Sequence, residues 1–294
     1  MTRGLALVLL SAALPSSAQS SSACSSTCHL AEHASWQQSM HARSWTEPLF
    51  QASFGRARMR AWCRTCHTPD RSQPTAGITC EVCHLHDGVV LASKVPSPEA
   101  VQAHPIREDE GLSTTVCARC HQFRQPVLDR FPRQDTATWA QHTVSEWRDT
   151  GTTKSCADCH FKTHASTGAH DLERLRSVLS VEQLESGEVQ VQVGNVGHRV
   201  PTGDPFRALV FEACASAECG TVLKRYTFGR SLRESDAGIV DDLDTRLEPS
   251  TTRVLVVPRE GRWWQLRMIY AEPGLEGHLP PAAVSQIISS GAFK

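Results

Sequence analysis

Cys63-Arg-Thr-Cys66-His67 is the first of four Cys-x-x-Cys-His pentapeptides in this chain; the others are Cys80-Glu-Val-Cys83-His84, Cys117-Ala-Arg-Cys120-His121 and Cys156-Ala-Asp-Cys159-His160. The pattern is typical of covalent c-type haem attachment, in which both thiols add to the vinyl groups of the porphyrin. The histidine that follows the second cysteine binds the iron as its proximal ligand. Four copies exclude coincidence, and we therefore expect several bound haems and electron-transfer chemistry.

A related motif, Cys24-Ser-Ser-Thr-Cys28-His29, stands upstream with three residues between the thiols. We interpret it as a fifth attachment site with His29 as proximal ligand, because a bulged loop still lets both thiols reach the vinyl groups. The alternatives are a local disulfide or a degenerate relic. Zinc is disfavoured throughout, because a tetrahedral zinc site does not need a histidine directly after the second cysteine. The sequence thus predicts five haems c.

The last two of the twelve cysteines, Cys214 and Cys219, lie between two apolar runs. Gly220 follows the second cysteine where a haem motif would have a histidine. We expect a disulfide across a hairpin, which an oxidising compartment permits. Two free buried thiols are the alternative.

The first residues, 1–18, have the pattern of a secretory signal peptide. Arg3 supplies the positive charge, Gly4 to Leu14 form an apolar core too short to cross a bilayer, and Ser16-Ser17-Ala18 offers a cleavage site. No later stretch is long and apolar enough for a transmembrane helix. We expect an exported protein, periplasmic or extracellular, without a membrane span.

The charge of the chain is nearly balanced, with a formal net charge of -1 at pH 7. This excludes the strongly basic surface that nucleic-acid binding requires. The expected partners are therefore redox proteins that donate and accept electrons.

The chain changes character near residue 180, which predicts an α+β fold of two domains. Residues 19–184 would form a mostly helical and irregular domain that holds every haem motif. Residues 185–294 would form a small β-sandwich, because Glu188 to Val193 alternate strictly and further strand patterns follow. Those further strands are expected at 206–211, 221–228, 252–257 and 263–270. Helical patterns are expected at 30–46, 136–149 and 171–184.

Nine histidines lie outside the motifs, whereas only three methionines follow the signal segment, so we expect mainly bis-histidine irons. Spacing argues against His33, His86 and His164 as ligands of their own local haems, because each would lie on the side of its proximal ligand, although each could bind another haem. His278 lies in a Gly/Pro-rich tail and is not expected to bind. The distal candidates are His41, His104, His142, His170 and His198.

Two of these candidates carry a structural implication. On a continuous helix His41 would stand about 18 Å from His29, so it would reach a neighbouring haem. His198 lies on a glycine-rich loop, Gly194 to Pro205, at the start of the β domain. This loop could project His198 back to a haem and fix the two domains against each other.

Three segments also resemble a known family. They are the run Cys28 to Arg43, with Trp36 followed by Ser-Met-His-Ala, the segment Gln141-His-Thr-Val-Ser-Glu-Trp147, and the loop Gly197-His-Arg-Val-Pro-Thr-Gly203. They are similar to multihaem c-type cytochromes related to the tetrahaem cytochromes that accept electrons from hydroxylamine oxidoreductase. The resemblance implies close-packed bis-histidine haems in respiratory electron transfer, with His41 and His198 as distal ligands. The three-residue spacer before Cys28 departs from the family pattern.

Three functions fit these observations. The first is an electron carrier, not an enzyme, in which electrons move between closely spaced haems. The second is a multihaem oxidoreductase that acts on a small nitrogen or sulfur compound at one open-coordinate haem. The third, compatible with the first, is a module whose β domain docks a partner. No Cys-x-x-Cys-Lys motif, which some such enzymes use, occurs in the chain.

Overall fold

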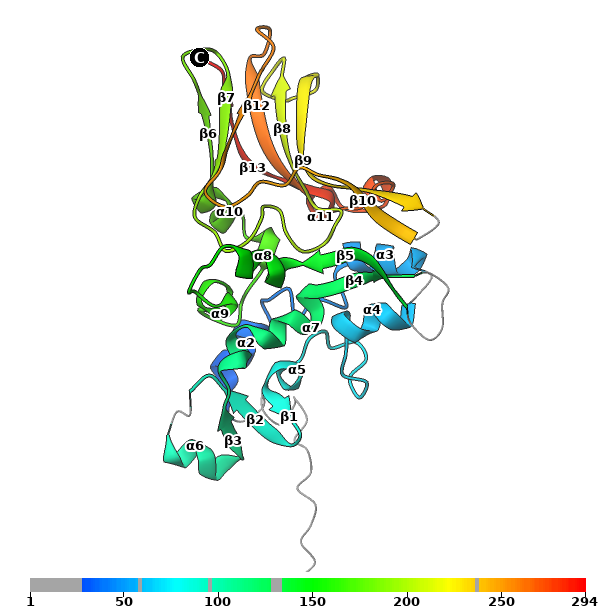
Figure 1. Ribbon diagram of the computed structural model, residues 1–294, viewed down its shortest axis with the longest axis vertical. Coiled ribbons are helices and arrows are strands. Elements are labelled where there is room, and N and C mark those ends of the chain that lie inside the picture. The colour runs from blue at the N-terminus through cyan, green and yellow to red at the C-terminus, as the bar shows by residue number, and fades with distance from the viewer. Residues whose placement is uncertain (1–27, 58–59, 95–96, 128–133, 236–237) are drawn as a thin grey trace, which may run out of the picture.

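The fold combines a helical half and a strand-rich half. The computed structural model describes residues 28–57, 60–94, 97–127, 134–235 and 238–294, and both helices and strands are extensive, which confirms the expected α+β class. Figure 1 shows the sandwich of strands at one end of the molecule and the motif-bearing helices at the other. The predicted signal segment and Cys24 lie outside the described residues.

The helical half consists of short elements joined by turns. Its helices are α2 (Leu30–Trp36), α3 (Pro48–Arg56), α4 (Arg60–His67), α5 (Cys80–His84), α6 (Pro98–Ala103), α7 (Ala118–His121), α8 (Thr143–Asp149) and α9 (Cys156–His160), with 3-10 turns η1 (Glu110–Ser113), η2 (Thr115–Cys117) and η3 (Gly168–His170). Its strands are β1 (Leu85–His86), β2 (Val89–Ala92) and β3 (Ile106–Glu108) in one sheet, and β4 (Gln122–Pro126) and β5 (Asp135–His142) in another.

This half has very little apolar core of its own. Among the described residues before α10, the buried apolar side chains are Ile78, Leu91, Ala140 and Val144. A chain segment of this length normally needs a larger buried apolar area to offset its conformational entropy. Its stability must therefore come largely from groups other than its own aliphatic side chains.

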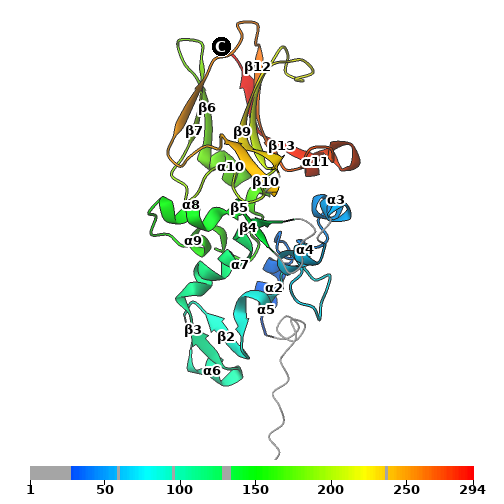
Figure 2. The same ribbon diagram turned by 45° about the vertical axis from the view of Figure 1, so that its right-hand side comes forward.

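The strand-rich half is a two-layer sandwich. Its elements are α10 (Leu172–Val178), β6 (Leu179–Gln183), β7 (Val189–Val193), β8 (Ala208–Cys214), β9 (Val222–Ser235), β10 (Gly238–Asp244), β11 (Thr252–Leu255), β12 (Trp263–Ile269), η4 (Glu276–His278), α11 (Pro281–Val284) and β13 (Ser285–Ala292). A five-stranded antiparallel sheet in the order β10-β9-β8-β12-β13 faces a three-stranded sheet in the order β11-β7-β6. Figure 2 shows β6 and β7 standing apart from the larger sheet.

Alternation along the strands builds the sandwich core. Val189, Val191 and Val193 of β7 are all buried, and they pack in one cluster with residues of the opposite sheet such as Leu209 and Phe211. Because successive side chains of a strand point to opposite faces, every second residue enters the core. The expected strand at 188–193 is confirmed, and the later strand predictions each overlap an observed strand.

Three helix predictions were only partly correct. The predicted helix at 30–46 ends at Trp36, where the indole Nε1 donates to the Ile78 carbonyl and the chain continues in turns. Residues 136–142 belong to strand β5, because they pair with β4, and the helix begins only at Thr143. Residues 179–183 form strand β6, which pairs with β7. In each case pairing with a distant segment overrides a local helical pattern.

A side-chain contact joins the two halves at the β9–β10 hairpin. Arg230 of β9 has an almost fully buried side chain and donates from Nη1 to the Ala140 carbonyl of β5 at 2.9 Å. The same guanidinium pairs with Asp241 of β10, which offsets its burial. The hairpin therefore rests on the helical half (Figure 1).

The sandwich core predicts a clear difference between two apolar truncations. Phe211→Ala removes a ring that is 0% exposed and should lower the free energy of unfolding of the sandwich by about 3–5 kcal/mol. Val256→Ala, at a side chain that is 65% exposed, should change it by less than about 0.5 kcal/mol. Urea unfolding followed by circular dichroism measures both, and equal effects would contradict the assigned core.

Candidate functional site

Each of the four Cys-x-x-Cys-His motifs lies at the end of a short helix. The helices α4, α5, α7 and α9 all finish on the motif histidine, at His67, His84, His121 and His160. Residues three apart lie on one face of a helical turn, so each motif presents its two thiols together. In α9 a reciprocal capping box between Ser155 and Asp158 fixes the start of the turn.

Four of the five motif histidines face a second histidine from elsewhere in the chain. The distances between ring centroids are 6.3 Å for His29 and His104, 6.2 Å for His84 and His164, 6.4 Å for His121 and His41, and 6.1 Å for His160 and His198. The partner rings come from four separate segments, including the glycine-rich loop of the sandwich half. Chance packing would not repeat one spacing four times.

The spacing matches that of two imidazoles on opposite sides of one metal ion. A metal–imidazole bond of about 2.0 Å and a ring-centre-to-nitrogen distance of roughly 1.15 Å, counted on both sides, place the centroids about 6.3 Å apart. Directly stacked rings, such as those of His170 and Tyr270 at 4.2 Å, lie much closer. The spacing of the four pairs is therefore compatible with two imidazoles on one iron.

Hydrogen bonds at the second ring nitrogen favour the same interpretation. The Nδ1 atoms of His84 and His198 donate to the carbonyls of Leu91 and Arg199 at 2.9 and 3.0 Å. His121 Nδ1 donates to the side-chain oxygen of Gln141 at 3.1 Å. Metal-binding histidines almost always hold their other nitrogen in this way, which fixes the tautomer and leaves Nε2 as the ligand.

Two further ring nitrogens fit the pattern. His67 Nδ1 donates to the Ser44 carbonyl at 2.9 Å, so its Nε2 is also left free for a metal. His104 Nδ1 is buried and has no protein partner. The same is true of His142 Nδ1, so this feature alone does not distinguish a metal ligand, and His104 is singled out by its facing of His29.

Burial keeps several of these imidazoles neutral. Desolvation lowers the pKa of His41 to about 4, with a further contribution from His121. Desolvation, followed by the influence of His198, lowers the pKa of His160 to about 4. The pKa values of His67, His121 and His164 are lowered mainly for the same reason. Only a neutral imidazole can bind a metal, so the rings are in the required form at neutral pH.

The attachment sites are close neighbours. A hydrogen bond with Cys156, followed by burial, raises the pKa of the Cys117 thiol, and a hydrogen bond with Cys66, followed by burial, raises that of Cys120. The motif of α7 thus touches those of α4 and α9, and Cys83 of α5 is close enough to influence both α7 thiols. Figure 1 shows α7 between α4, α5 and α9.

His67 is the exception among the motif histidines. Its ring stacks on Phe50 at 3.7 Å, and among the described ring contacts no second histidine faces it. All fourteen histidines lie within the described residues. Phe50 belongs to an aromatic cluster with Trp45 and Phe54, at centroid distances of 5.6 and 5.7 Å. Arg64 of α4 lies over the Trp45 ring at 4.1 Å.

The remaining histidines make other contacts. His142 forms an ion pair with Glu146 at 3.0 Å, and His170 stacks on Tyr270, so neither of these two predicted distal candidates faces a motif histidine. His33 stacks on Trp36, and His86 pairs with Asp87. The structure brings His41, His104 and His198 to motif histidines.

His164 was not among the distal candidates, yet it faces His84. Its spacing argues against His164 only as a ligand of its own motif, four residues upstream. The helix α9 ends at His160. The intervening residues therefore do not continue the helix, and the His164 ring can turn towards α5. No local sequence signal pairs His164 with His84; the general supply of spare histidines was the only indication.

The loop that carries His198 is held by charged residues of both halves. Arg246 forms ion pairs with Glu146 of α8 at 2.7 Å and with Asp244 at 2.8 Å. Arg199, next to His198, pairs with Asp244 at 2.9 Å. Val200 and Leu247 exchange backbone hydrogen bonds, which fixes the two segments side by side.

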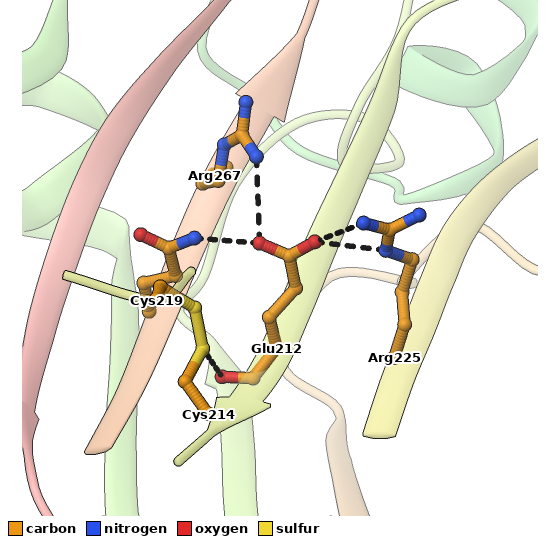
Figure 3. The surroundings of a disulfide bond; sticks show 6 residues. Glu212, Cys214, Cys219, Arg225 and Arg267 are labelled. Atoms are coloured by element: carbon orange, nitrogen blue, oxygen red, sulfur yellow. Dashed lines mark hydrogen bonds and ion pairs between the residues drawn. A yellow bond between two sulfur atoms is a disulfide. The ribbon is translucent and has the colours of Figure 1, made fainter. Parts of the chain in front are cut away.

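A second charged cluster lies within the five-stranded sheet, beside the disulfide. Cys214 and Cys219 are joined in the structure, as expected from the sequence. Figure 3 shows the nearby Glu212 carboxylate between Arg225 and Arg267, paired at 2.6 and 3.4 Å. Glu212 is 1% exposed, and its partners lie only on β9 and β12.

The described residues lack two other features. They contain no group of three or more His, Cys, Asp or Glu side chains placed to hold a bare metal ion. Within the same residues, no helix combines the length and apolar character needed to cross a bilayer.

Comparison with known proteins gives a similarity of fold. No protein-family model matches the chain, and no curated protein matches it. The structure is similar to that of a penta-heme cytochrome c552 from Thermochromatium tepidum, with a TM-score of 0.69 and 19% sequence identity. The match covers 92% of this chain and 97% of that one, so it includes both halves.

The charged cluster of Asp244, Arg246 and Arg199 at the His198 loop predicts a pH-dependent stability. Burial would raise the pKa of Asp244, but hydrogen bonds and charge from Arg246 and Arg199 outweigh it and lower the pKa from 3.8 to about 2. A depressed pKa stabilises the fold above the unfolded pKa, and this stabilisation is lost as pH falls through the folded value. Asp244→Asn should therefore lower the free energy of unfolding by on the order of 1–2 kcal/mol at neutral pH.

That difference should shrink steadily as the pH falls from about 4 towards 2. Urea unfolding of both proteins across this range measures it. Asp242→Asn provides the control, because Asp242 forms only an exposed pair with Arg233 at 3.5 Å. A destabilisation by Asp244→Asn that is the same at every pH would contradict the assignment.

Proposed function

We propose that this chain is a multihaem c-type cytochrome that transfers electrons between redox partners through five covalently attached haems. The observation that carries the proposal is the four histidine pairs at 6.1–6.4 Å, each joining a motif histidine to a distant one. The Cys-x-x-Cys-His motifs and the similarity of fold to a penta-heme cytochrome support it. Each haem, when bound, supplies a one-electron iron couple.

The attachment thiols and ligands follow from this proposal. The proximal ligands are His29, His67, His84, His121 and His160, each with its own cysteine pair. The distal ligands are His104 for the first motif, His164 for the third, His41 for the fourth and His198 for the fifth in chain order. Cys24 completes the first attachment site. Bis-histidine ligation favours lower reduction potentials than Met/His ligation.

The residues of the chain set the environment of each iron. Carbonyl and amide acceptors hold the second nitrogens of His84, His121 and His198, which orients the rings and makes them stronger donors. The haems also supply the apolar interior that the helical half lacks among its own side chains. Folding of that half and loading with haem are therefore coupled.

The contacts between motifs support a branched route for electrons. The α7 motif touches the α4 and α9 motifs through Cys120–Cys66 and Cys117–Cys156. The haem of α7 is then the hub through which the others exchange electrons. The partners are redox proteins, and we place the protein in the periplasm or outside the cell on the signal-peptide pattern. The link to hydroxylamine oxidoreductase pathways rests on sequence resemblance.

Two measurements test the haem and ligand assignment. The intact mass of the mature protein should show five added haems. His41→Ala, His104→Ala, His164→Ala and His198→Ala should each remove about one low-spin ferric haem from the EPR spectrum and add a high-spin signal, because the iron loses its sixth ligand. His86→Ala, at a half-exposed histidine paired with Asp87, should leave the spectrum unchanged. Unchanged spectra in all four variants would contradict the pairs.

A second candidate function is favoured by His67. Among the described residues no imidazole faces His67, so its iron is the one suited to bind a small external ligand. The carboxylates of Asp204 and Glu47 lie close enough to influence its pKa, and carboxyl groups can move protons near the site. This arrangement fits an oxidoreductase acting on a small nitrogen or sulfur compound.

The second function predicts that one iron differs from the rest. The wild-type ferric protein should show about one high-spin haem, and the reduced protein should bind about one carbon monoxide per chain, because only one iron has an open position. His67→Ala should shift the absorption spectrum of that carbon monoxide adduct, because the iron loses its imidazole ligand, whereas His86→Ala should leave the adduct spectrum unchanged. If titration finds no carbon monoxide site and all five haems are low-spin, a sixth ligand from this chain occupies the position and the second function is wrong.

A further inference from the structure

The loop of His198 is the place where the sandwich half reaches into the helical half. It runs between β7 and β8 and brings the His198 ring to 6.1 Å from that of His160, with the two rings nearly parallel at 14°. His160 belongs to α9 of the helical half. The distance between these rings therefore depends on how the two halves sit against each other.

A single carboxylate of the helical half holds this loop. Glu146 of α8 is 6% exposed, and its Oε2 accepts from the Thr202 hydroxyl at 2.7 Å and from the Arg199 backbone N–H at 3.3 Å. The Arg199 donor follows His198 directly in the sequence, and the Thr202 donor lies three residues further along the loop. Thr143 of α8 adds a hydroxyl–hydroxyl contact with Thr202 at 2.9 Å.

The other carboxylate oxygen faces a second segment of the sandwich half. Glu146 Oε1 forms an ion pair with Arg246 at 2.7 Å and lies 3.0 Å from His142 Nε2. Arg246 is also 6% exposed, and it is held in turn by Asp244. Glu146 thus connects α8 to the segments around residues 199–202 and 244–248.

Burial makes this arrangement close to all-or-none. A buried carboxylate without partners is very unfavourable, so Glu146 requires both segments to be in place. If the sandwich half moved away, the Glu146–Arg246 pair would break, and Glu146 would keep only His142 and Arg246 only Asp244 as a close partner. The cluster therefore favours one relative placement of the halves, the placement in which His198 faces His160.

We propose that Glu146 and Arg246 are positioning residues that hold His198 in place as the distal ligand opposite His160. The sandwich half is then a carrier of one axial ligand, and its docking controls the ligation of one haem. This inference rests on the proposed function, because it takes His160 and His198 as ligands of one iron. The competing view is that the cluster stabilises the fold without affecting the ligand.

The test compares two buried carboxylates of the same protein. Glu146→Gln removes the charge from the cluster that holds the loop, and Glu212→Gln removes it from the matched cluster of Arg225, Arg267 and Gln265 in the sheet. We expect the ferric EPR spectrum of Glu146→Gln to lose about one low-spin haem, in the manner of His198→Ala, because the ring is no longer held on the iron. Glu212→Gln should keep the wild-type spectrum.

Two further variants separate positioning from general destabilisation. The double variant Glu146→Gln/His198→Ala should show no loss beyond that of His198→Ala, since both act on the same haem. Added imidazole should restore the low-spin signal in either single variant. Thr202→Val, which removes only the hydroxyl bound to Glu146, should give a smaller loss of the same signal and serves if Glu146→Gln does not fold.

The outcomes distinguish the positioning role of Glu146 from the ligand assignment of His198. If Glu146→Gln and Thr202→Val keep the full low-spin spectrum while His198→Ala loses one haem, the positioning role is wrong and the ligand assignment stands. If His198→Ala itself keeps the full low-spin spectrum, the assignment of His198 is wrong and the inference falls with it. An equal loss of low-spin haem in Glu146→Gln and Glu212→Gln would also overturn the inference.

Discussion

Two imidazoles that face each other across a fixed gap are the constraint on which this structure depends. A metal ion sets that gap to within a few tenths of an ångström, whereas apolar packing would accept many separations. Each pair joins a motif histidine to a segment that is distant in sequence, such as His29 to His104. Under the proposed function, the pairs would act as cross-links that determine how the irregular segments fold around the haems.

This constraint explains the uneven distribution of the apolar core. The sandwich half buries a continuous cluster between its two sheets, as a β-sandwich must. The helical half buries few aliphatic side chains, and short helices of four to nine residues are not stable in isolation. Under the proposed function, metal–ligand bonds and buried porphyrin surface would stabilise the helical half in place of the aliphatic side chains that stabilise the sandwich.

The two halves meet through apolar packing, such as that of Leu49 of α3 on the sandwich core, and through polar contacts. Arg230 donates to the backbone of β5, and Glu146 accepts from the loop of His198. Hydrogen bonds and ion pairs are directional, so they specify a single docking geometry more strictly than an apolar interface would. A ring that must meet an iron needs that precision. The Glu212 cluster shows that a buried ion pair can also serve one sheet alone.

Much of this arrangement could be predicted from local sequence. The strand of Val189, Val191 and Val193 follows from alternation, whereas the attachment role of the Cys-x-x-Cys-His cysteines stays a prediction. Residues 136–142 could not be assigned correctly, because their strand conformation depends on pairing with β4. His164 can face His84 because α9 ends at His160, and the spacing of residues in the sequence does not predict where this helix ends.

His142 shows how closely related sequence signals can lead to different roles. Like His41, it lies in a segment that resembles a haem-binding family, and both rings are largely buried. His142, however, has Glu146 four residues later, at the spacing that brings side chains together on a helix, and the two pair at 3.0 Å. That carboxylate also needs Arg246, which comes from the other half. At His142 the acidic residue at this spacing makes the imidazole part of a charged cluster, and in the proposed assignment the ligand in this region is His198.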